Sequence, residues 1–241
     1  YIKEYNLNQK KFLMISRFKK LLSKYRKFLF GNYRGHVLST TICGEIEKLE
    51  KLKRKKVIKI LDFGSGFNPI LINKIIKKLT HKYKNTKFLA YCYDFYTKKE
   101  LKIMNTNSNI KFLNINSLSN NKVNKFNFCL AIDVLHHIGL HNSRKIFEIV
   151  KKLRKRSKFL IIKDHFQYGF FSNMALIFMD YFGNYGDNTK IPRTYFTIKT
   201  FENFLSKMNL EELKRIDNKK YYKWYWFYFN SSKLQFISIV K

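Results

Sequence analysis

The chain has 241 residues, enough for one well-buried α/β domain with an appended helical segment and too few for two enzymatic domains. Its 45% hydrophobic content excludes a disordered chain, because that much apolar surface offsets the entropy of ordering the backbone. The 49 Lys and Arg against 16 Asp and Glu give a formal net charge of +33, which suggests a nucleic acid or an anionic membrane as partner. Because the lysines are spread along the whole chain, a bias in composition explains this charge slightly better.

Cysteine usage and the apolar runs indicate the cellular compartment. Cys43, Cys92 and Cys129 show neither a CxxC pair nor the spacing of metal ligands, so we expect buried free thiols in a reducing compartment and no metal. No signal peptide with a cleavage site is visible, and the longest apolar stretch, Phe170 to Phe182, is too short to span a bilayer. We therefore expect a cytoplasmic protein, with peripheral membrane contact as a further option.

The first part of the chain predicts two helices. Apolar residues recur at three- and four-residue spacing among lysines from Gln9 to Phe30, which is typical of a basic amphipathic helix. Packing on the core is the favoured interpretation, and a membrane-surface or lid helix is the alternative. A second helix is predicted over Val37 to Leu52. We therefore divide the chain into an N-terminal helical extension, residues 1–34, and a main domain, residues 35–241.

From Val57 onward, predicted strands and helices alternate. The strands cover residues 57–63, 87–93, 110–115, 126–132 and 159–163, and the helices between them cover 70–79, 97–104 and 143–152. A mixed segment, a helix over 197–208 and two strands, 212–217 and 234–240, complete the chain. Near-continuous apolar strands separated by helices indicate a parallel sheet covered on both faces. The predicted fold class is therefore α/β, a doubly wound, Rossmann-like sheet.

The first strand leads into the sequence Asp62-Phe63-Gly64-Ser65-Gly66. Two glycines allow the backbone to turn sharply and to approach a ligand without an intervening side chain. A glycine pair after a strand is a weak signal by itself, because ordinary loops and dinucleotide sites also contain it.

Polar residues follow the next two strands. Asp94 ends the second strand, where a carboxylate can accept both hydroxyls of a ribose. The alternative is a solvated acid or a helix cap, which we disfavour because acids are scarce in this chain. Asn116 and Ser117 follow the third strand and can both donate to and accept from an adenine edge, although turn formation explains them equally well.

The fourth strand leads into Asp133-Val134-Leu135-His136-His137-Ile138. Together with the glycine loop and Asp94, this run resembles class I S-adenosylmethionine-dependent methyltransferases, particularly the subgroup with ubiquinone- and menaquinone-biosynthesis enzymes. The resemblance implies a seven-stranded, mostly parallel sheet with an antiparallel C-terminal strand, and an acceptor-covering insertion near residues 164–196. Family members often carry a small residue in place of Asn68 and an aspartate in place of Asn116.

The resemblance also assigns cofactor contacts. Asp62, Gly64 and Gly66 would surround the methionine part of S-adenosyl-L-methionine, Asp94 would hold the ribose, Asn116 and Ser117 would contact the adenine, and Asp133 would complete the cofactor-binding set.

Methyl transfer needs little covalent help, because the sulfonium is already activated; the enzyme aligns the reactants and excludes water. A general base is needed only when the acceptor carries a proton with a high pKa. His136 and His137 are the first candidates, since histidine titrates near neutral pH, and satisfaction by local hydrogen bonds is an equally good explanation for either. Asp164 and His165, after the fifth strand, are further catalytic candidates at the same edge.

The sequence does not identify the methyl acceptor. The aromatic and apolar insertion favours a small-molecule or lipid-like acceptor. The charge, and Asp133 with Lys163 at positions where 2′-O enzymes place part of a Lys-Asp-Lys-Glu tetrad, make RNA methylation the alternative, which we do not favour. A nicotinamide-dependent oxidoreductase is disfavoured by the missing third glycine. A non-catalytic binding module is a third alternative. The oligomeric state is not predicted.

Overall fold

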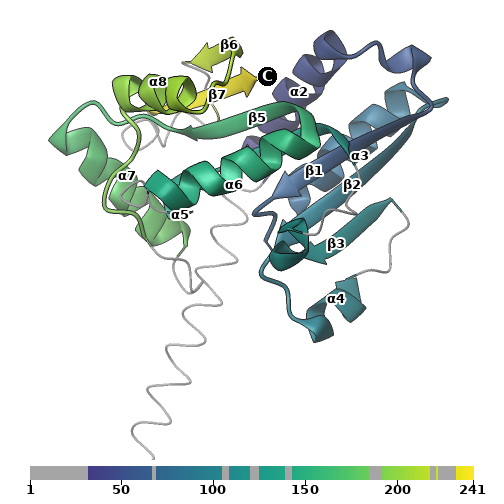
Figure 1. The fold of residues 1–241 in the computed structure, drawn as a ribbon, viewed down its shortest axis with the longest axis horizontal. Coiled ribbons are helices and arrows are strands. Elements are labelled where there is room, and N and C mark those ends of the chain that lie inside the picture. The colour runs from purple at the N-terminus through teal and green to yellow at the C-terminus, as the bar shows by residue number, and fades with distance from the viewer. Residues whose placement is uncertain are drawn as a thin grey trace, which may run out of the picture.

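The computed structural model describes residues 32–66, 69–104, 109–119, 125–138, 143–184, 191–217, 221 and 232–241. The amphipathic helix expected over residues 9–30, Asn68, and all of the aromatic run 221–229 except Tyr221 lie outside the described residues. The described strands form one seven-stranded sheet (Figure 1).

The strands are β1 (Val57–Phe63), β2 (Lys87–Asp94), β3 (Ile110–Asn114), β4 (Phe126–Ile132), β5 (Ser157–His165), β6 (Glu212–Asp217) and β7 (Gln235–Val240). The α-helices are α2 (Asn32–Leu49), α3 (Ile70–Lys82), α4 (Lys98–Met104), α5 (Leu135–Ile138), α6 (Ser143–Arg156), α7 (Phe170–Gly183) and α8 (Ile198–Lys207). Short 3-10 helices are η2 (Leu52–Arg54), η3 (Ile115–Ser119) and η5 (Ser232–Leu234).

The strand order is β3-β2-β1-β4-β5-β7-β6. The first five strands in this order pair in parallel, whereas β7 runs antiparallel to both β5 and β6. This confirms the predicted doubly wound, seven-stranded sheet with an antiparallel C-terminal strand. The chain order reverses between β1 and β4, and ligands of such sheets bind at the carboxyl ends of the strands beside that point. A ligand site is therefore expected at the loops after β1, β2 and β4.

Helices cover both faces of the sheet, as Figure 1 shows. One core cluster packs α2 and α3 against one face, and a second packs α6 and α8 against the other. The pleat of β5 divides its side chains accordingly, with Phe159 and Ile161 in the first cluster and Leu160 and Ile162 in the second. Two buried faces explain why the strands read as continuous apolar runs.

Several predicted boundaries differ from the structure by one to five residues, and the differences at α2, at β5 and in the mixed segment bear on the site. Helix α2 begins at Asn32 and ends at Leu49, before the predicted end at Leu52, whose buried backbone instead accepts a hydrogen bond from Thr86 at 2.9 Å. Strand β5 continues to His165, because Gln235 of β7 pairs with it. The mixed segment contains a full helix, α7, formed by the longest apolar stretch.

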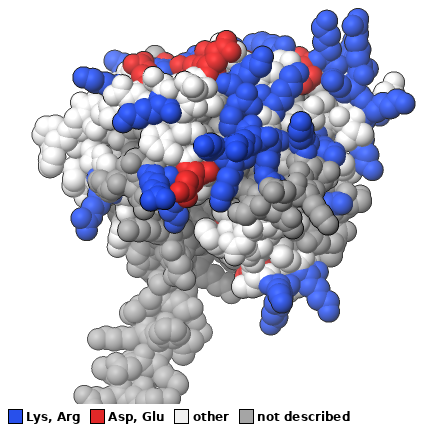
Figure 2. All heavy atoms as spheres, viewed as in Figure 1, with Lys and Arg blue, Asp and Glu red and all other residues white. Residues whose placement is uncertain are grey.

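The basic residues are distributed over most of the face drawn in Figure 2 and are not confined to one stripe. All three cysteines are buried free thiols, as predicted. No helix in the described parts of the chain is long and apolar enough to cross a membrane.

Candidate cofactor and acceptor site

The glycine loop after β1 has a backbone that only glycine adopts readily. Gly64 and Gly66 have φ angles of 74° and 65°, in the left-handed region. A Cβ atom on Gly64 would lie 2.5 Å from Cγ2 of Val134, so Gly64 is also required by close packing against the loop after β4. A Cβ atom on Gly66 would meet nothing within 4 Å. The loop therefore packs closely against the protein at Gly64, whereas space around Gly66 is open.

Asp94 at the end of β2 is joined to this loop. Its Oδ2 accepts a hydrogen bond from the Gly66 amide at 2.7 Å, and its Oδ1 accepts one from the Phe95 amide at 2.7 Å. A carboxylate has about four lone-pair positions, so two stay available for hydroxyl donors. The predicted juxtaposition of the glycine loop and Asp94 is therefore present in the structure.

Tyr96 supports the same loop and was missed by sequence reasoning. Its hydroxyl donates to the Gly66 carbonyl at 2.6 Å, and the Ser65 hydroxyl lies 2.7 Å from it. Since the single phenolic proton is used on Gly66, Ser65 must be the donor of the second bond. The Tyr96 side chain is buried, and a tyrosine two residues after a strand-end acid was the available signal.

Asp62, beside the loop, is a buried carboxyl group. Burial, reinforced by the charge of Asp94, raises the pKa of Asp62 to about 7. A buried acid is costly to ionise unless a cation compensates it. Two carboxylates next to an open glycine loop therefore form a site complementary to a ligand that carries a positive charge and hydroxyl groups.

The residues predicted to contact adenine lie on η3. Ser117 donates its hydroxyl proton to the Asn114 carbonyl at 2.6 Å, and the Asn116 amide donates to Oδ1 of Asn114 at 2.9 Å. Both bonds are those of a turn, and the exposed Asn116 side chain keeps access to solvent. Phe95 was not predicted as a site residue, yet it follows Asp94 directly and is 72% exposed.

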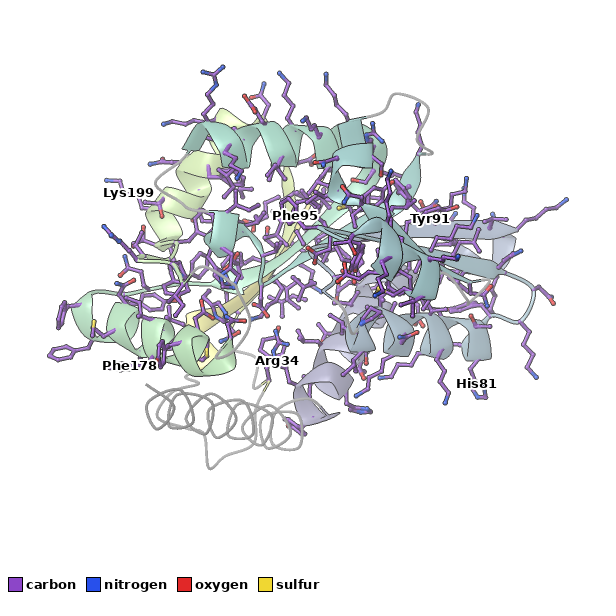
Figure 3. All side chains as sticks on the ribbon, turned by 90° about the horizontal axis from the view of Figure 1, so that it is seen from below. Arg34, His81, Tyr91, Phe95, Phe178 and Lys199 are labelled. Carbon is purple, nitrogen blue, oxygen red and sulfur yellow. The ribbon has the colours of Figure 1, made fainter. Side chains whose placement is uncertain are left out.

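Asp133, at the end of β4, is the centre of an ion cluster. Its carboxylate pairs with the guanidinium of Arg34 and the ammonium of Lys163, and Nε2 of His165 lies 3.3 Å from its Oδ1. The φ angle of Asp133 is 52°, so a left-handed backbone turns this side chain into the cluster. Figure 3 shows Arg34 between the α7 side of the molecule, marked by Phe178, and the α3 side, marked by His81.

The ammonium of Lys163 is fully buried. Burial and then the charge of Arg34 lower the pKa of Lys163 well below its usual value, against the opposing charges of Asp164 and Asp180. A lysine whose pKa is lowered in this way releases its proton more readily than an exposed lysine does.

His136 lies in a second buried cluster. Its Nδ1 donates to Oδ1 of Asp164 at 2.6 Å, and its Nε2 lies 3.2 Å from Oδ2 of Asp180 on α7. Burial lowers the pKa of His136, but the two carboxylates outweigh it and raise this pKa to about 9. The His136 ring is therefore in its doubly protonated, cationic form at neutral pH. The hydroxyl of Tyr195 lies 2.5 Å from the same oxygen of Asp180.

His137 and His165 flank His136. The His137 ring is half-buried, 4.1 Å from the His136 ring between centroids. Burial, followed by the charges of Lys163 and His136, lowers the pKa of His165 well below its usual value. Nδ1 of His165 is buried and has no hydrogen-bond partner among the described residues. The four predicted catalytic residues, His136, His137, Asp164 and His165, thus lie in one region at the carboxyl ends of β4 and β5.

Arg34, Asp180 and Tyr195 also belong to this region, although the sequence analysis did not single them out as site residues. Arg34, which was assigned to the N-terminal extension, contacts a carboxylate that lies 99 positions later in the sequence. The signal for Asp180 was a single acid within an otherwise apolar helix.

No protein-family model and no curated protein matches this chain. Solved structures with a similar fold include LepI in complex with SAM, with a TM-score of 0.52 and 13% identity over 82% of this chain and 46% of that one. An O-methyltransferase family protein from Burkholderia thailandensis gives 0.53 and 12% over 85% and 56%, and the pyocyanin biosynthetic protein PhzM gives 0.51 and 9% over 82% and 53%.

This chain has the class I methyltransferase fold. The chain spans about half the length of these structures, and at such identities the likeness shows the fold alone.

Proposed function

We propose that this protein is an S-adenosyl-L-methionine-dependent methyltransferase that acts on a small-molecule or lipid-like acceptor. The observation that carries the proposal is the bond from the Gly66 amide to Asp94, with buried Asp62 beside the same loop. This arrangement at the reversal point of the sheet suits a cationic nucleoside. The proposal agrees with the similar folds of LepI, solved in complex with SAM, and of the Burkholderia protein, an O-methyltransferase family member.

The residues present fit the cofactor. Asp62 would pair with the ammonium of its methionine part, and the free lone pairs of Asp94 would accept the ribose hydroxyls. The exposed Phe95 ring offers a stacking surface for adenine, with Asn116 and Ser117 near its edge. The cofactor supplies an activated methyl group, and the chain positions the acceptor in line with it and excludes water.

Asp133, which the resemblance placed in the cofactor-binding set, has a different role in this proposal. Arg34 and Lys163 already neutralise its carboxylate, so we place it on the acceptor side. Nε of Arg34, the hydroxyl of Tyr221 and the amide of Gln235 are buried without a hydrogen-bond partner among the described residues. Unpaired buried groups of this kind are costly, and a polar acceptor group would satisfy them.

The apolar part of the acceptor would lie along the insertion that contains α7. Phe170 and Phe171 at its start are 72% and 87% exposed, which also favours peripheral contact with a membrane as the source of a lipid-like acceptor. The resemblance to quinone-biosynthesis enzymes makes a phenolic acceptor the first choice for a screen.

The base, where the acceptor needs one, is His165 in this proposal. Both ring nitrogens of His136 face carboxylates, those of Asp164 and Asp180, whereas Nδ1 of His165 has no hydrogen-bond partner among the described residues and can accept a proton. His136 and Asp164 then position the surrounding groups, and His137 faces a more exposed side of the same cluster.

A second candidate function is methylation of an RNA ribose. The observation that favours it is the ion cluster itself, because the structure joins Asp133 to Lys163 and adds Arg34 as a second cation. Binding to RNA would weaken steeply with salt as counterions are released. A filter-binding assay with total RNA that shows no salt dependence would remove this candidate.

Calorimetry with S-adenosylhomocysteine and with NAD tests the proposed function. We expect binding of S-adenosylhomocysteine alone, and binding of NAD alone would contradict the proposal. A screen with methyl-labelled cofactor against phenols, lipid extract and total RNA then identifies the acceptor class. A chain that binds the cofactor and labels nothing in these three pools would favour a non-catalytic module.

A further inference from the structure

The cluster around His136 holds the ligand set of a metal site. A ring nitrogen of His136, a ring nitrogen of His137 and a carboxylate oxygen of Asp180 all lie within 4.8 Å of one another. The two histidines come from α5, directly after β4, whereas Asp180 comes from α7, and Figure 1 shows these two helices next to each other. The cluster therefore joins the insertion to the carboxyl edge of the sheet.

The distances suit a transition-metal ion. Zinc binds histidine nitrogen and carboxylate oxygen at about 2.0 to 2.2 Å in tetrahedral geometry, which sets neighbouring ligand atoms about 3.3 Å apart. Nε2 of His136 and Oδ2 of Asp180 are already 3.2 Å apart. A ring nitrogen of the half-buried His137 also lies within 4.8 Å of the other two ligand atoms.

An unpaired buried nitrogen at the cluster also points to a ligand. Nε2 of His136 is buried and, despite its closeness to Asp180, makes no hydrogen bond of acceptable geometry among the described residues. Such orphaned buried groups are rare in folded proteins and call for an explanation, an ion among them. A metal cation between these atoms would displace the proton on Nε2 and bind this nitrogen and the Asp180 carboxylate together.

The opposite side of the His136 ring is arranged as in metal sites. Its Nδ1 bonds to Oδ1 of Asp164 at 2.6 Å, and metal-binding histidines almost always donate their second ring proton to a carboxylate or carbonyl in this way. The Tyr195 hydroxyl, 2.5 Å from Oδ2 of Asp180, holds the carboxylate in the same manner.

We propose that His136, His137 and Asp180 bind a divalent transition-metal ion, with Zn²⁺ as the best match. Two imidazoles and one carboxylate are ligands that suit zinc, whereas magnesium and calcium prefer oxygen alone. Three protein ligands leave one tetrahedral position for water or another oxygen ligand, which is the pattern of catalytic zinc sites. The site is distinct from the glycine loop and does not depend on the proposed cofactor.

Cobalt titration of the chelator-stripped full chain tests the site. Ordered Co²⁺ coordination produces visible d–d absorption, and we expect this absorption to saturate at one ion per chain and to be displaced by Zn²⁺. It should be lost in His137→Ala and in Asp180→Asn. Asp164→Asn removes only the positioning partner of His136 and should weaken binding about 10- to 100-fold. His81→Ala, an exposed histidine at the end of α3, is the matched control and should titrate like the wild type.

Circular dichroism and thermal melting establish whether each variant is folded. If Asp180→Asn fails to fold, His137→Ala decides, because its ring is only half-buried. Absence of the d–d absorption in the wild type, or its survival in folded His137→Ala, overturns the proposal. Calorimetry with S-adenosylhomocysteine on His137→Ala should be unchanged, so failure of the metal site is distinguishable from failure of the cofactor site.

Discussion

The amide of Gly66 donates a hydrogen bond to Oδ2 of Asp94 at 2.7 Å and so fixes the loop after β1 to the end of β2. Both groups lie where two parallel strands end, and the Tyr96 hydroxyl donates a further hydrogen bond to the Gly66 carbonyl of the same loop. A single carboxylate therefore orders the loop, and in the proposed function its remaining lone pairs accept the ribose hydroxyls.

Asp94→Asn tests this double role. The amide keeps the shape but loses the charge and half of the acceptor capacity, and hydrogen bonds to charged groups contribute about 1.5 to 3 kcal/mol. We expect S-adenosylhomocysteine to bind about 10- to 100-fold more weakly in calorimetry. Glu148→Gln, an exposed acid on α6, is the control and should bind like the wild type. Equal affinities in both variants would remove Asp94 from the cofactor site.

Gly66→Ala separates backbone strain from ligand exclusion. The left-handed φ of 65° makes alanine cost about 1 kcal/mol of folding free energy, while the protein itself offers space for the methyl group. We expect a small decrease in stability and a large loss of cofactor affinity. Gly169→Ala is the matched control, because Gly169 also has a positive φ and open surroundings. Its affinity should be unchanged, and a parallel loss in both variants would indicate general damage.

Asp62 predicts a pH dependence of stability. Its pKa, raised to about 7, makes the folded state retain a proton that the unfolded state has already lost. The retained proton on Asp62 contributes about 4 kcal/mol to the free energy of unfolding. This contribution is fully present below the unfolded pKa of about 4 and is lost as pH rises through about 7. Urea unfolding of Asp62→Asn should show a weaker decline over this window than the wild type does.

Cofactor affinity should follow the same group with the opposite sign. In the proposed function an ionised Asp62 would pair with the cofactor's ammonium and a protonated one would not, so binding should strengthen as pH rises from about 5 to about 8. Calorimetry in buffers of different ionisation enthalpy would show proton release on binding. An equally steep dependence in Asp62→Asn would assign the effect to another residue.

The sequence predicts local features well and tertiary pairs poorly, for a physical reason. Strands β1, β4 and β6 occur at the predicted residues, because a run of apolar or alternating side chains specifies a strand through its immediate neighbours. The proximity of the glycine loop and Asp94 could also be predicted from the sequence, since parallel strands end at one edge of the sheet. In contrast, Arg34 reaches Asp133 from 99 positions away, and Asp180 meets His136 only because α7 folds back over α5. No spacing rule contains such contacts.

His165→Gln tests the assignment of the base. His165 lies beside the Asp133 and Lys163 pair, and its Nδ1 has no hydrogen-bond partner within the described chain, so that atom can accept a proton from a bound hydroxyl. Loss of a general base lowers turnover by about 10²- to 10⁴-fold, whereas calorimetric affinity for S-adenosylhomocysteine should stay the same. His36→Gln, an exposed histidine on α2, serves as the control. Unchanged turnover in His165→Gln would mean that catalysis depends on positioning alone, because methyl transfer from a sulfonium needs a base only when the acceptor holds its proton firmly.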